Sequence, residues 1–265
     1  MFDLDGLEAE LAQTVFAGNL HFAPVTDSTN NDALAAARAG APHGSVWFAD
    51  EQRAGRGRGG NAWRSAPGEG LYVSTLLRLA IPTDRLLLLP LAAGLAAAQA
   101  IRSAAGLDID LRWPNDLLIV ERKAGGILVE AKSENSGAAF AVVGIGINVH
   151  QREFEPGLAT PATSLDLASG RAVNRQALLV ALLRALDHEA NELHDPATAQ
   201  AIPARVEAAS TWVRGRAVEV HGPQACAGVT AGLDEQGFLL VETVDGRVTV
   251  QTGGVRAGIR SGEIH

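Results

Sequence analysis

The chain has 265 residues, of which 47% are hydrophobic, enough to build a sizeable buried core. Thirty acidic against 22 basic side chains give a formal net charge of -8, which excludes a broad positive surface for a nucleic-acid backbone. A single cysteine, Cys226, excludes an internal disulfide framework, and the acidic N-terminus lacks the pattern of a secretory signal. We therefore expect a globular protein of the cytoplasm that binds any anion through a local site.

Residues 25–40, with the sequence VTDSTNNDALAAARAG, predict a loop that leads into a helix. Capping residue types at 28–30 precede an alanine-rich segment. Residues 44–52 alternate like a strand, and residues 70–79 resume a pattern rich in β-forming residues. The segment between them, rich in glycine and arginine, is therefore predicted to connect two strands.

The longest apolar window, residues 85–103, has a charge at each end and contains a proline and a glycine. Because it is shorter than the roughly 20 apolar residues of a membrane span, we predict a core helix at 84–105 and no membrane partner. Asn174 is a good N-cap for a helical pattern over 175–194, and a second helix is predicted near 197–210. These two helices are expected to cover one face of a sheet.

Residues 110–132 predict three strands, separated by a Pro-Asn-Asp turn and by a tight turn at 121–123. Residues 138–150 predict one more strand, which is apolar enough to be buried. Beyond Trp212 the pattern changes to short β-type runs separated by turn residues. We expect a small β-barrel over 213–265, with a domain boundary near 213.

The segment GRGRGG, residues 55–60, combines two features that suit an anion. Glycine lets backbone N–H groups approach a phosphate or carboxylate, and arginine offers a planar fork of donors. A solvated turn or an RNA-binding tail has the same composition, so the motif alone does not decide. The predicted flanking strands and Trp63 favour a structured site over a disordered tail.

A second group lies in RWPNDLLIVERKAGG, where Asn115 and Asp116 occupy a predicted turn and Lys123 precedes paired glycines. A lysine beside glycines can bring its ammonium close to a ligand carboxylate or phosphate. Ordinary turn chemistry explains each of these residues taken singly, so their case depends on their combination with the loop. The third group, 28–30, is typical of helix caps, a role compatible with ligand contact at the same helix end.

Other chemistries find no support in the sequence. The seven histidines are scattered without ligand spacing, and neither CxxC nor HExxH occurs, so no built-in transition-metal site is expected. The patterns GxxxxGK[ST] and GxSxG are also missing. A Walker-type nucleotide site and a serine hydrolase are therefore disfavoured.

Six blocks, taken in order, closely resemble biotin protein ligase, the family of biotin-[acetyl-CoA-carboxylase] ligases. The blocks are DSTN (27–30), EQRAGRGRGGNAW (51–63), GLYVS (70–74), RWPNDL (112–117), RKAGGILVE (122–130) and GIGINV (144–149). The resemblance covers nearly the whole chain, including the C-terminal segment that ends in TGGVR. A chance match to six blocks in this order is much rarer than a chance match to one block.

The resemblance implies an α+β fold, with a mixed sheet and helices related to the class II aminoacyl-tRNA synthetase fold over 1–212. It implies an SH3-like β-barrel over 213–265. The reaction it implies joins biotin and ATP to biotinyl-5′-AMP and pyrophosphate, and a lysine of biotin carboxyl carrier protein then takes the biotinyl group. Mg²⁺ accompanies the ATP. No nucleic-acid partner is expected, and a homodimer formed through the sheet is compatible with the resemblance.

The resemblance also implies roles for individual residues. Those expected to bind biotin are Ser28, Thr29, Asn30, Gln52, Arg56, Gly57, Arg58, Lys123 and Gly126. Those expected to bind ATP or the adenylate are Gly55, Arg56, Arg58, Gly59, Gly60, Trp63, Asn115, Asp116, Lys123 and Asn148. Because a carboxylate must meet an electron-rich α-phosphate, the cations Arg56, Arg58 and Lys123 are the catalytic candidates. The two arginines are expected to fold over the adenylate and shield it from water. No metal ligand is identified.

Two positions depart from the family pattern. Arg112 stands where many members have lysine before WPND, and Gly59 stands where some have a further arginine, which predicts a looser loop. Longer members carry an N-terminal helix-turn-helix, whereas DSTN begins here at residue 27, so we expect a ligase without repressor activity.

Two rival functions remain open from the sequence. A lipoate ligase on a similar scaffold also activates a carboxylate with ATP, although GRGRGG, WPNDL and the C-terminal barrel favour biotin. A non-catalytic RNA-binding or nucleotide-binding module would use the glycine-arginine loop and Trp63, and the net charge of -8 argues against it.

Overall fold

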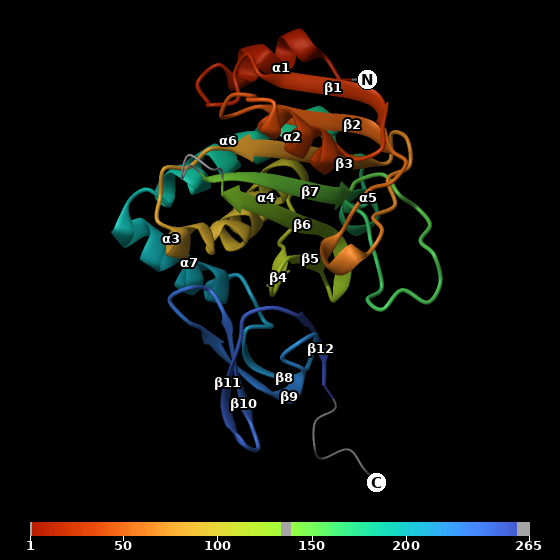
Figure 1. Ribbon diagram of the computed structural model, residues 1–265. Coiled ribbons are helices and arrows are strands. Elements are labelled where there is room, and N and C mark those ends of the chain that lie inside the picture. The colour runs from red at the N-terminus through yellow and green to blue at the C-terminus, as the bar shows by residue number, and fades with distance from the viewer. Residues whose placement is uncertain (1, 134–138, 259–265) are drawn as a thin grey trace.

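The computed structural model describes residues 2–133 and 139–258, which form two β-sheets with helices packed on the larger one. The larger sheet has seven strands in the order β1-β2-β3-β7-β6-β5-β4, in which only β1 and β2 are parallel. The smaller sheet has five antiparallel strands in the order β11-β10-β9-β8-β12. Figure 1 shows the smaller sheet below the larger one, at the C-terminal end of the described chain.

The elements of the first part of the chain are α1 (Leu4–Leu11), β1 (Leu20–Thr26), α2 (Thr29–Arg38), β2 (Val46–Gln52), η1 (Arg58–Gly60), β3 (Gly70–Leu77), α3 (Thr83–Leu86), α4 (Leu89–Ala105), β4 (Asp110–Arg112), β5 (Asp116–Ile119), β6 (Arg122–Ser133) and β7 (Ala139–Asn148). The remaining elements are α5 (Leu165–Ser169), α6 (Arg175–Glu192), α7 (Pro196–Ala208), β8 (Arg214–His221), β9 (Cys226–Leu233), β10 (Leu239–Thr243), β11 (Gly246–Val250) and β12 (Gly254–Ala257). The expected α+β fold is confirmed, and the second sheet is consistent with the expected SH3-like barrel.

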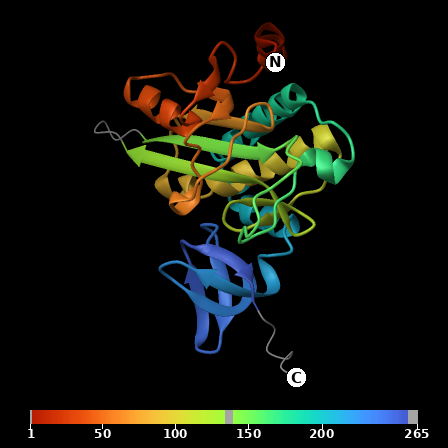
Figure 2. The same cartoon turned by 90° about the vertical axis from the view of Figure 1, so that its right-hand side faces the viewer.

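The two faces of the large sheet are covered by different helices, as the two views in Figures 1 and 2 show. Successive strand residues point to opposite faces. Leu77 and Val143 accordingly belong to the main core with α4 and α6, whereas Leu76 and Val142 pack against α2. The even-numbered residues of β3, β6 and β7 therefore share the α2 face, and register pairs such as Ser74 with Gly144 lie opposite one another there.

The predicted core helix is present, but it is divided. α3 and α4 replace one helix over 84–105, and Pro90 lies in the first turn of α4, where its missing N–H costs nothing. This stretch, Thr83–Ala105, is long and apolar enough to cross a membrane by length and composition alone. Within the described residues, however, ten of its residues in α4 are buried, among them Leu89 and Ile101.

The helix predicted after Asn174 is confirmed as α6, and the Asn174 side chain accepts hydrogen bonds from the backbone N–H groups of Gln176 and Ala177. α7 confirms the helix predicted near 197–210. Ser28 occupies the N-cap position of α2, but its side chain makes no capping hydrogen bond there. The capping interpretation of that residue is therefore corrected.

The sequence did not indicate β1 or the short helices η1 and α5. β1 is an edge strand that contains Pro24, a residue that disfavours a strand pattern but is tolerated at a sheet edge. The first residue of the strand predicted over 138–150, Ala138, lies outside the described residues, as do residues 259–265 of the expected barrel.

The two sheets contact each other through specific hydrogen bonds. The indole Nε1 of Trp113 donates to the carbonyl of Gly237 at 3.0 Å. Arg216 of β8 makes two hydrogen bonds with Glu121, at 2.8 and 3.0 Å, in the tight turn between β5 and β6. Val120 and Glu121 both have positive φ, 45° and 63°, as a two-residue hairpin turn of this hand requires. The second sheet thus supports the same hairpin that carries Lys123.

Candidate active site

A cleft of about 1350 Å³ lies on the α2 face of the large sheet. Its walls are the loop between β2 and β3, the floor formed by β6 and β7, the segment after β7, and the turn between β11 and β12. A pocket for one drug-sized ligand measures roughly 300–1,000 Å³, so this cleft has room for two joined ligands.

Nearly all the residues expected to bind ligand line this one cleft. They are Ser28, Thr29, Asn30, Gln52, Gly55, Arg56, Gly57, Arg58, Gly59, Trp63, Asn115, Asp116, Lys123, Gly126 and Asn148. The exception is Gly60, which is exposed and is not among the lining residues. Segments 100 residues apart in sequence thus meet in one place, as the hydrogen bond between Asn30 and Glu130 illustrates.

One end of the cleft carries a buried hydrogen-bond network around the start of α2. Gln52 Oε1 accepts from the backbone N–H of Thr29 at 2.9 Å and from its hydroxyl at 3.1 Å. The Thr29 hydroxyl also lies 2.8 Å from the Ser74 hydroxyl. Gln52 Nε2 donates to Ser65 at 2.8 Å. Ser28 is only 1% exposed, and within the described chain its hydroxyl makes no hydrogen bond, so it is available to a ligand.

Asn30 extends this network to β6. Its Oδ1 accepts from Ser74 Oγ at 2.5 Å, and its Nδ2 donates to Glu130 Oε2 at 3.0 Å. The same carboxylate oxygen of Glu130 accepts from Arg56 Nη2 at 2.5 Å. A Cβ at Gly144 would lie 1.9 Å from Asn30 Oδ1, which explains why glycine occupies that position of β7.

Ser74 and Glu130 were not predicted as site residues. Each ends a sequence block that carries the resemblance, GLYVS and RKAGGILVE, so a signal was present. Side chains alternate between the two faces along β3 and β6, and this alternation places Ser74 and Glu130 on the α2 face beside Asn30.

The floor of the cleft is made of glycines, on which Trp63 packs. A Cβ at Gly146 would lie 2.7 Å from the Trp63 indole, and a Cβ at Gly126 would lie 3.5 Å from it. Lys123 Nζ lies 5.5 Å from the centre of the same ring, within the range of a cation–π contact. The Trp63 Nε1 is buried and has no hydrogen-bond partner within the described residues. Trp63 therefore offers both an aromatic face and an unused donor.

Lys123 is held by a carboxylate and a second cation. Its Nζ lies 2.5 Å from Asp116 Oδ1, and Arg112 donates to the other oxygen of Asp116 from Nε at 3.1 Å and from Nη2 at 2.6 Å. The backbone of Lys123 is held on both sides, since its N–H donates to Pro161 at 2.8 Å and its carbonyl accepts from Thr163 at 3.0 Å. The segment after β7 thus runs along the start of β6.

The two predicted asparagines use their side chains to hold the backbone around this lysine. Asn115 Nδ2 donates to the carbonyl of Ile127 at 2.9 Å. Asn148 Nδ2 donates to the carbonyl of Thr163 at 3.0 Å and to that of Lys123 at 3.4 Å. Both amides line the cleft, and their donors stabilise its wall.

The glycine-arginine loop is held by few backbone hydrogen bonds of its own. Gly57 donates to Asn61 at 2.7 Å and Trp63 donates to Gly55 at 2.8 Å. Gly59 has a φ of 69°, in the left-handed region that favours glycine. Arg58 reaches the second sheet, where it donates to the carbonyl of Gly253 and to Thr252 Oγ1. Burial lowers the pKa of Arg58, and the nearby Asp116 acts in the opposite direction.

Tyr72 and Gln151 form a further buried polar pair in the cleft that the sequence did not indicate. The Tyr72 hydroxyl donates to the carbonyl of Ala66 at 3.2 Å and accepts from Gln151 Nε2 at 3.5 Å. Burial raises the pKa of Tyr72, so the hydroxyl remains a donor at neutral pH. The Gln151 Oε1 is buried and has no partner within the described chain, which leaves an acceptor at the cleft wall.

A metal-binding cluster is not found in the part of the chain that the structure describes, since no three histidine, cysteine, aspartate or glutamate side chains come together in a suitable group. The carboxylate beside the catalytic candidates, Asp116, already accepts from Arg112 and Lys123 with its two oxygens. The oxygen atoms of this cluster therefore do not form a Mg²⁺ site that the protein builds alone.

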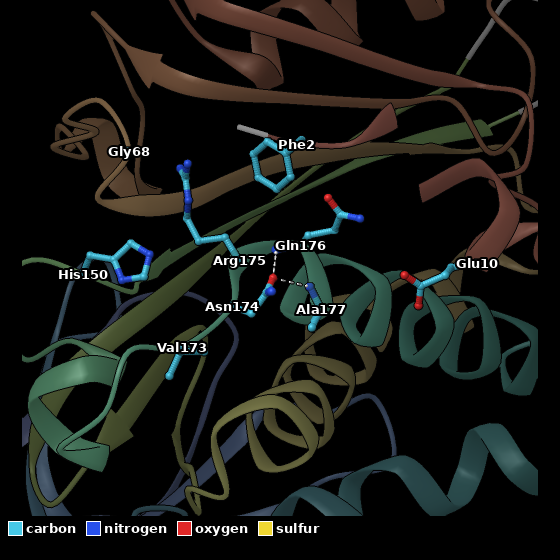
Figure 3. A pocket seen from close by; sticks show the side chains of 9 residues that line it. All are labelled: Phe2, Glu10, Gly68, His150, Val173, Asn174, Arg175, Gln176 and Ala177. Atoms are coloured by element: carbon cyan, nitrogen blue, oxygen red, sulfur yellow. Dashed lines mark hydrogen bonds between the residues drawn. The ribbon is translucent and has the colours of Figure 1, made fainter. Parts of the chain in front are cut away.

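A second cavity of about 500 Å³ lies beside the start of α6 (Figure 3). Figure 3 shows Arg175 between Phe2 and His150. The Arg175 guanidinium donates to Asp50 at 2.7 Å and to the carbonyl of Gly70 at 3.1 Å. Its charge is thus already paired within the protein.

The mixed sheet and the cleft that combines a polar network with cations define a ligase of the biotin and lipoate type. The model of the family described as "Biotin/lipoate A/B protein ligase family" matches residues 22–148. This range contains every residue expected to bind ligand.

Curated relatives and a solved structure narrow this class. The chain is 34% identical to "Biotin--[acetyl-CoA-carboxylase] ligase" of Mycobacterium tuberculosis, over 86% of this chain and 85% of that protein. It is 34% identical to "Bifunctional ligase/repressor BirA" of Bacillus spizizenii, over 96% of this chain and 77% of that protein. The structure "Biotin protein ligase from Aquifex aeolicus in complex with biotin and ATP" is 30% identical with a TM-score of 0.77, covering 90% of this chain and 98% of that one. The chain belongs to the biotin protein ligase family.

Proposed function

We propose that this protein activates biotin with ATP to form biotinyl-5′-AMP and pyrophosphate, and then transfers the biotinyl group to a lysine of biotin carboxyl carrier protein. The observation that carries the proposal is one continuous cleft in which a buried polar network at α2 lies beside the cationic group around Lys123. The names of the similar proteins support the choice of biotin and ATP.

The network at α2 suits the ureido group of biotin, which presents two N–H donors and one carbonyl acceptor. Ser28 has a free hydroxyl, and Asn30 and Gln52 present amides that are already oriented by neighbours. A buried polar group left unpaired costs about 1–3 kcal/mol, so such preorganised partners stabilise bound biotin. We assign the ureido group to Ser28, Thr29, Asn30 and Gln52.

The cations suit the bond-forming step. The biotin carboxylate attacks the α-phosphorus of ATP, an acyl–phosphate bond forms, and pyrophosphate leaves with the electron pair of the broken P–O bond. Lys123 lies at the floor between the two ends of the cleft, where its ammonium can neutralise both anions. Positioning and charge neutralisation supply most of the rate acceleration for such a step.

The loop suits retention of the intermediate. Arg56 donates to Glu130, so its side chain lies beside the polar network at α2. Arg58 contacts the turn between β11 and β12. Closure over biotinyl-5′-AMP requires Arg58 to exchange Thr252 and Gly253 for the phosphate. A closed loop keeps water from the mixed anhydride until the lysine amine of the carrier attacks its carbonyl and AMP leaves.

Mg²⁺ is proposed to enter with ATP, held mainly by phosphate oxygens and water, as is usual for nucleotide sites. Transcriptional repression is not part of the proposal, because a net charge of -8 offers no broad positive surface for DNA.

The test is the mass of a purified biotin carboxyl carrier domain incubated with the protein. We expect the mass increase of one biotinyl group when biotin, ATP and Mg²⁺ are all present, and no increase when biotin or ATP is withheld. Lipoate replaces biotin in a parallel reaction. Modification with lipoate but not with biotin would identify the rival ligase, and no modification with either acid would contradict the proposal.

A further inference from the structure

Arg112, which stands where many members of the family have lysine, is buried and contacts three different side chains. It is 7% exposed, and its Nε and Nη2 both donate to Asp116 Oδ2. Nη2 also donates to Thr160 Oγ1 at 2.8 Å, and the guanidinium lies 5.0 Å from the centre of the Trp212 ring. A lysine has one nitrogen and no planar face, so it cannot reproduce this set.

The charges of this cluster do not cancel. Arg112 and Lys123 carry two positive charges at neutral pH and share one negative charge, that of Asp116, which leaves a net charge of +1. If Arg112 were uncharged, Lys123 and Asp116 would form a neutral pair at 2.5 Å. An anionic ligand would then have to compete with Asp116 for the lysine, and the floor would no longer add to the attraction of the loop arginines Arg56 and Arg58.

We propose that Arg112 is a positioning residue that neutralises Asp116 and so releases the charge of Lys123 to an anionic ligand. This inference rests on the proposed function, in which Lys123 receives the biotin carboxylate and the α-phosphate. Asp116 holds the lysine in place before the ligand arrives, and Arg112 lets the lysine turn to the ligand without leaving a buried carboxylate unpaired.

The test separates charge from packing by comparing biotin with biotinol, the neutral alcohol that lacks the carboxylate. Binding of each compound without ATP is measured by calorimetry for the parent, Arg112→Gln, Arg112→Lys, Asp116→Asn and the double variant Arg112→Gln/Asp116→Asn. We expect Arg112→Gln to weaken biotin binding about tenfold or more and to change biotinol binding less than about twofold. Arg112→Lys retains the charge and is expected to lose about threefold or less.

The double variant is the decisive arm. Removing both Arg112 and the carboxylate of Asp116 returns the cluster to +1, so biotin binding should recover to within about threefold of the parent. Arg175→Gln is the matched control, since Arg175 also pairs with an aspartate, Asp50, and lies over an aromatic ring, with its guanidinium 5.1 Å from the centre of Phe2, but outside the cleft. It is expected to change neither ligand's affinity.

Three results would overturn the inference. One is equal weakening of biotin and biotinol by Arg112→Gln, which would mean a role in packing alone. Another is unaltered biotin binding in that variant, and the third is a double variant no better than Arg112→Gln. A different result would contradict the proposed function itself. In that case the parent protein would bind neither compound and would give no biotin-dependent exchange of pyrophosphate into ATP.

Discussion

The two sides of the cleft are built in different ways. The floor belongs to the large sheet, where β6 and β7 pair in register from Gly125 with Ile147 to Ser133 with Ala139. The opposite side is the loop between β2 and β3, whose tip is exposed and whose Arg58 is held by side-chain contacts with a different sheet. Ladder hydrogen bonds hold the floor along its whole length, whereas the loop can exchange its few contacts for those of a ligand.

This difference assigns different tasks to the two sides. In the proposed function, bond formation requires charges held in place before the ligand arrives, and the ion pair of Lys123 with Asp116 in the floor meets that requirement. Retention of a reactive intermediate requires a part that opens and closes, which suits the loop. Substitutions in the floor should therefore abolish adenylate formation, and substitutions in the loop should let the adenylate escape.

The largest effect is expected for Lys123→Ala in the floor. Loss of the ammonium leaves two anions to approach without neutralisation, so biotin-dependent pyrophosphate exchange should fall by about 100-fold or more. Lys132→Ala, an exposed lysine on the same strand β6, is the matched control and should retain the parent rate. Unimpaired exchange in Lys123→Ala would remove this residue from the first step.

A smaller effect is expected for Gly144→Ala, also in the floor. Its Cβ would overlap Asn30 Oδ1 and push that side chain away from Ser74 and Glu130. Biotin binding should weaken by about tenfold to 100-fold, which corresponds to the roughly 1–3 kcal/mol of an unsatisfied buried group. ATP binding, measured in the same titrations, should change little. Equal loss of both ligands would show that the damage extends beyond the biotin end.

The smallest effect is expected for Arg58→Gly in the loop. The adenylate should still form, but the share released into solution per adenylate made should rise by about threefold to tenfold, because an opened loop admits exchange with solvent. Free biotinyl-5′-AMP is measured by chromatography after rapid filtration. Arg152→Gly, at an exposed position that does not line the cleft, is the control. If Arg58→Gly releases no more adenylate than the parent, Arg58 has no closing role.

Much of the fold could be predicted because its signals are local. The cap at Asn174, the apolar window that became α4 and the tight turn before Lys123 each depend on a few neighbouring residues. β1 was missed because Pro24 interrupts its strand pattern, and only its place at the sheet edge makes the proline acceptable. The division of the long helix between Leu86 and Leu89 was a difference of boundary, not of type.

The sequence motifs predicted most residues of the candidate site, and the strand register of the large sheet added Ser74 and Glu130. Glycines at 55–60 were predicted to let the backbone approach a ligand, whereas Gly144 and Gly146, which make room for Asn30 and Trp63, were indicated only as part of the block GIGINV. Gly60 shares the composition of its neighbours but not their position, since it lies outside the cleft wall. Composition alone cannot distinguish the two cases.

The sequence by itself determined the residue types that the chemistry needs, and their order along the chain was enough to indicate the family. The tertiary structure decided which of them pair. Arg58 meets Thr252 across 194 positions, and Arg112 shares Asp116 with Lys123 while stacking on Trp212. Such partners are chosen by the register of distant strands and by the packing of one sheet against another, and no local pattern in the sequence records these distances.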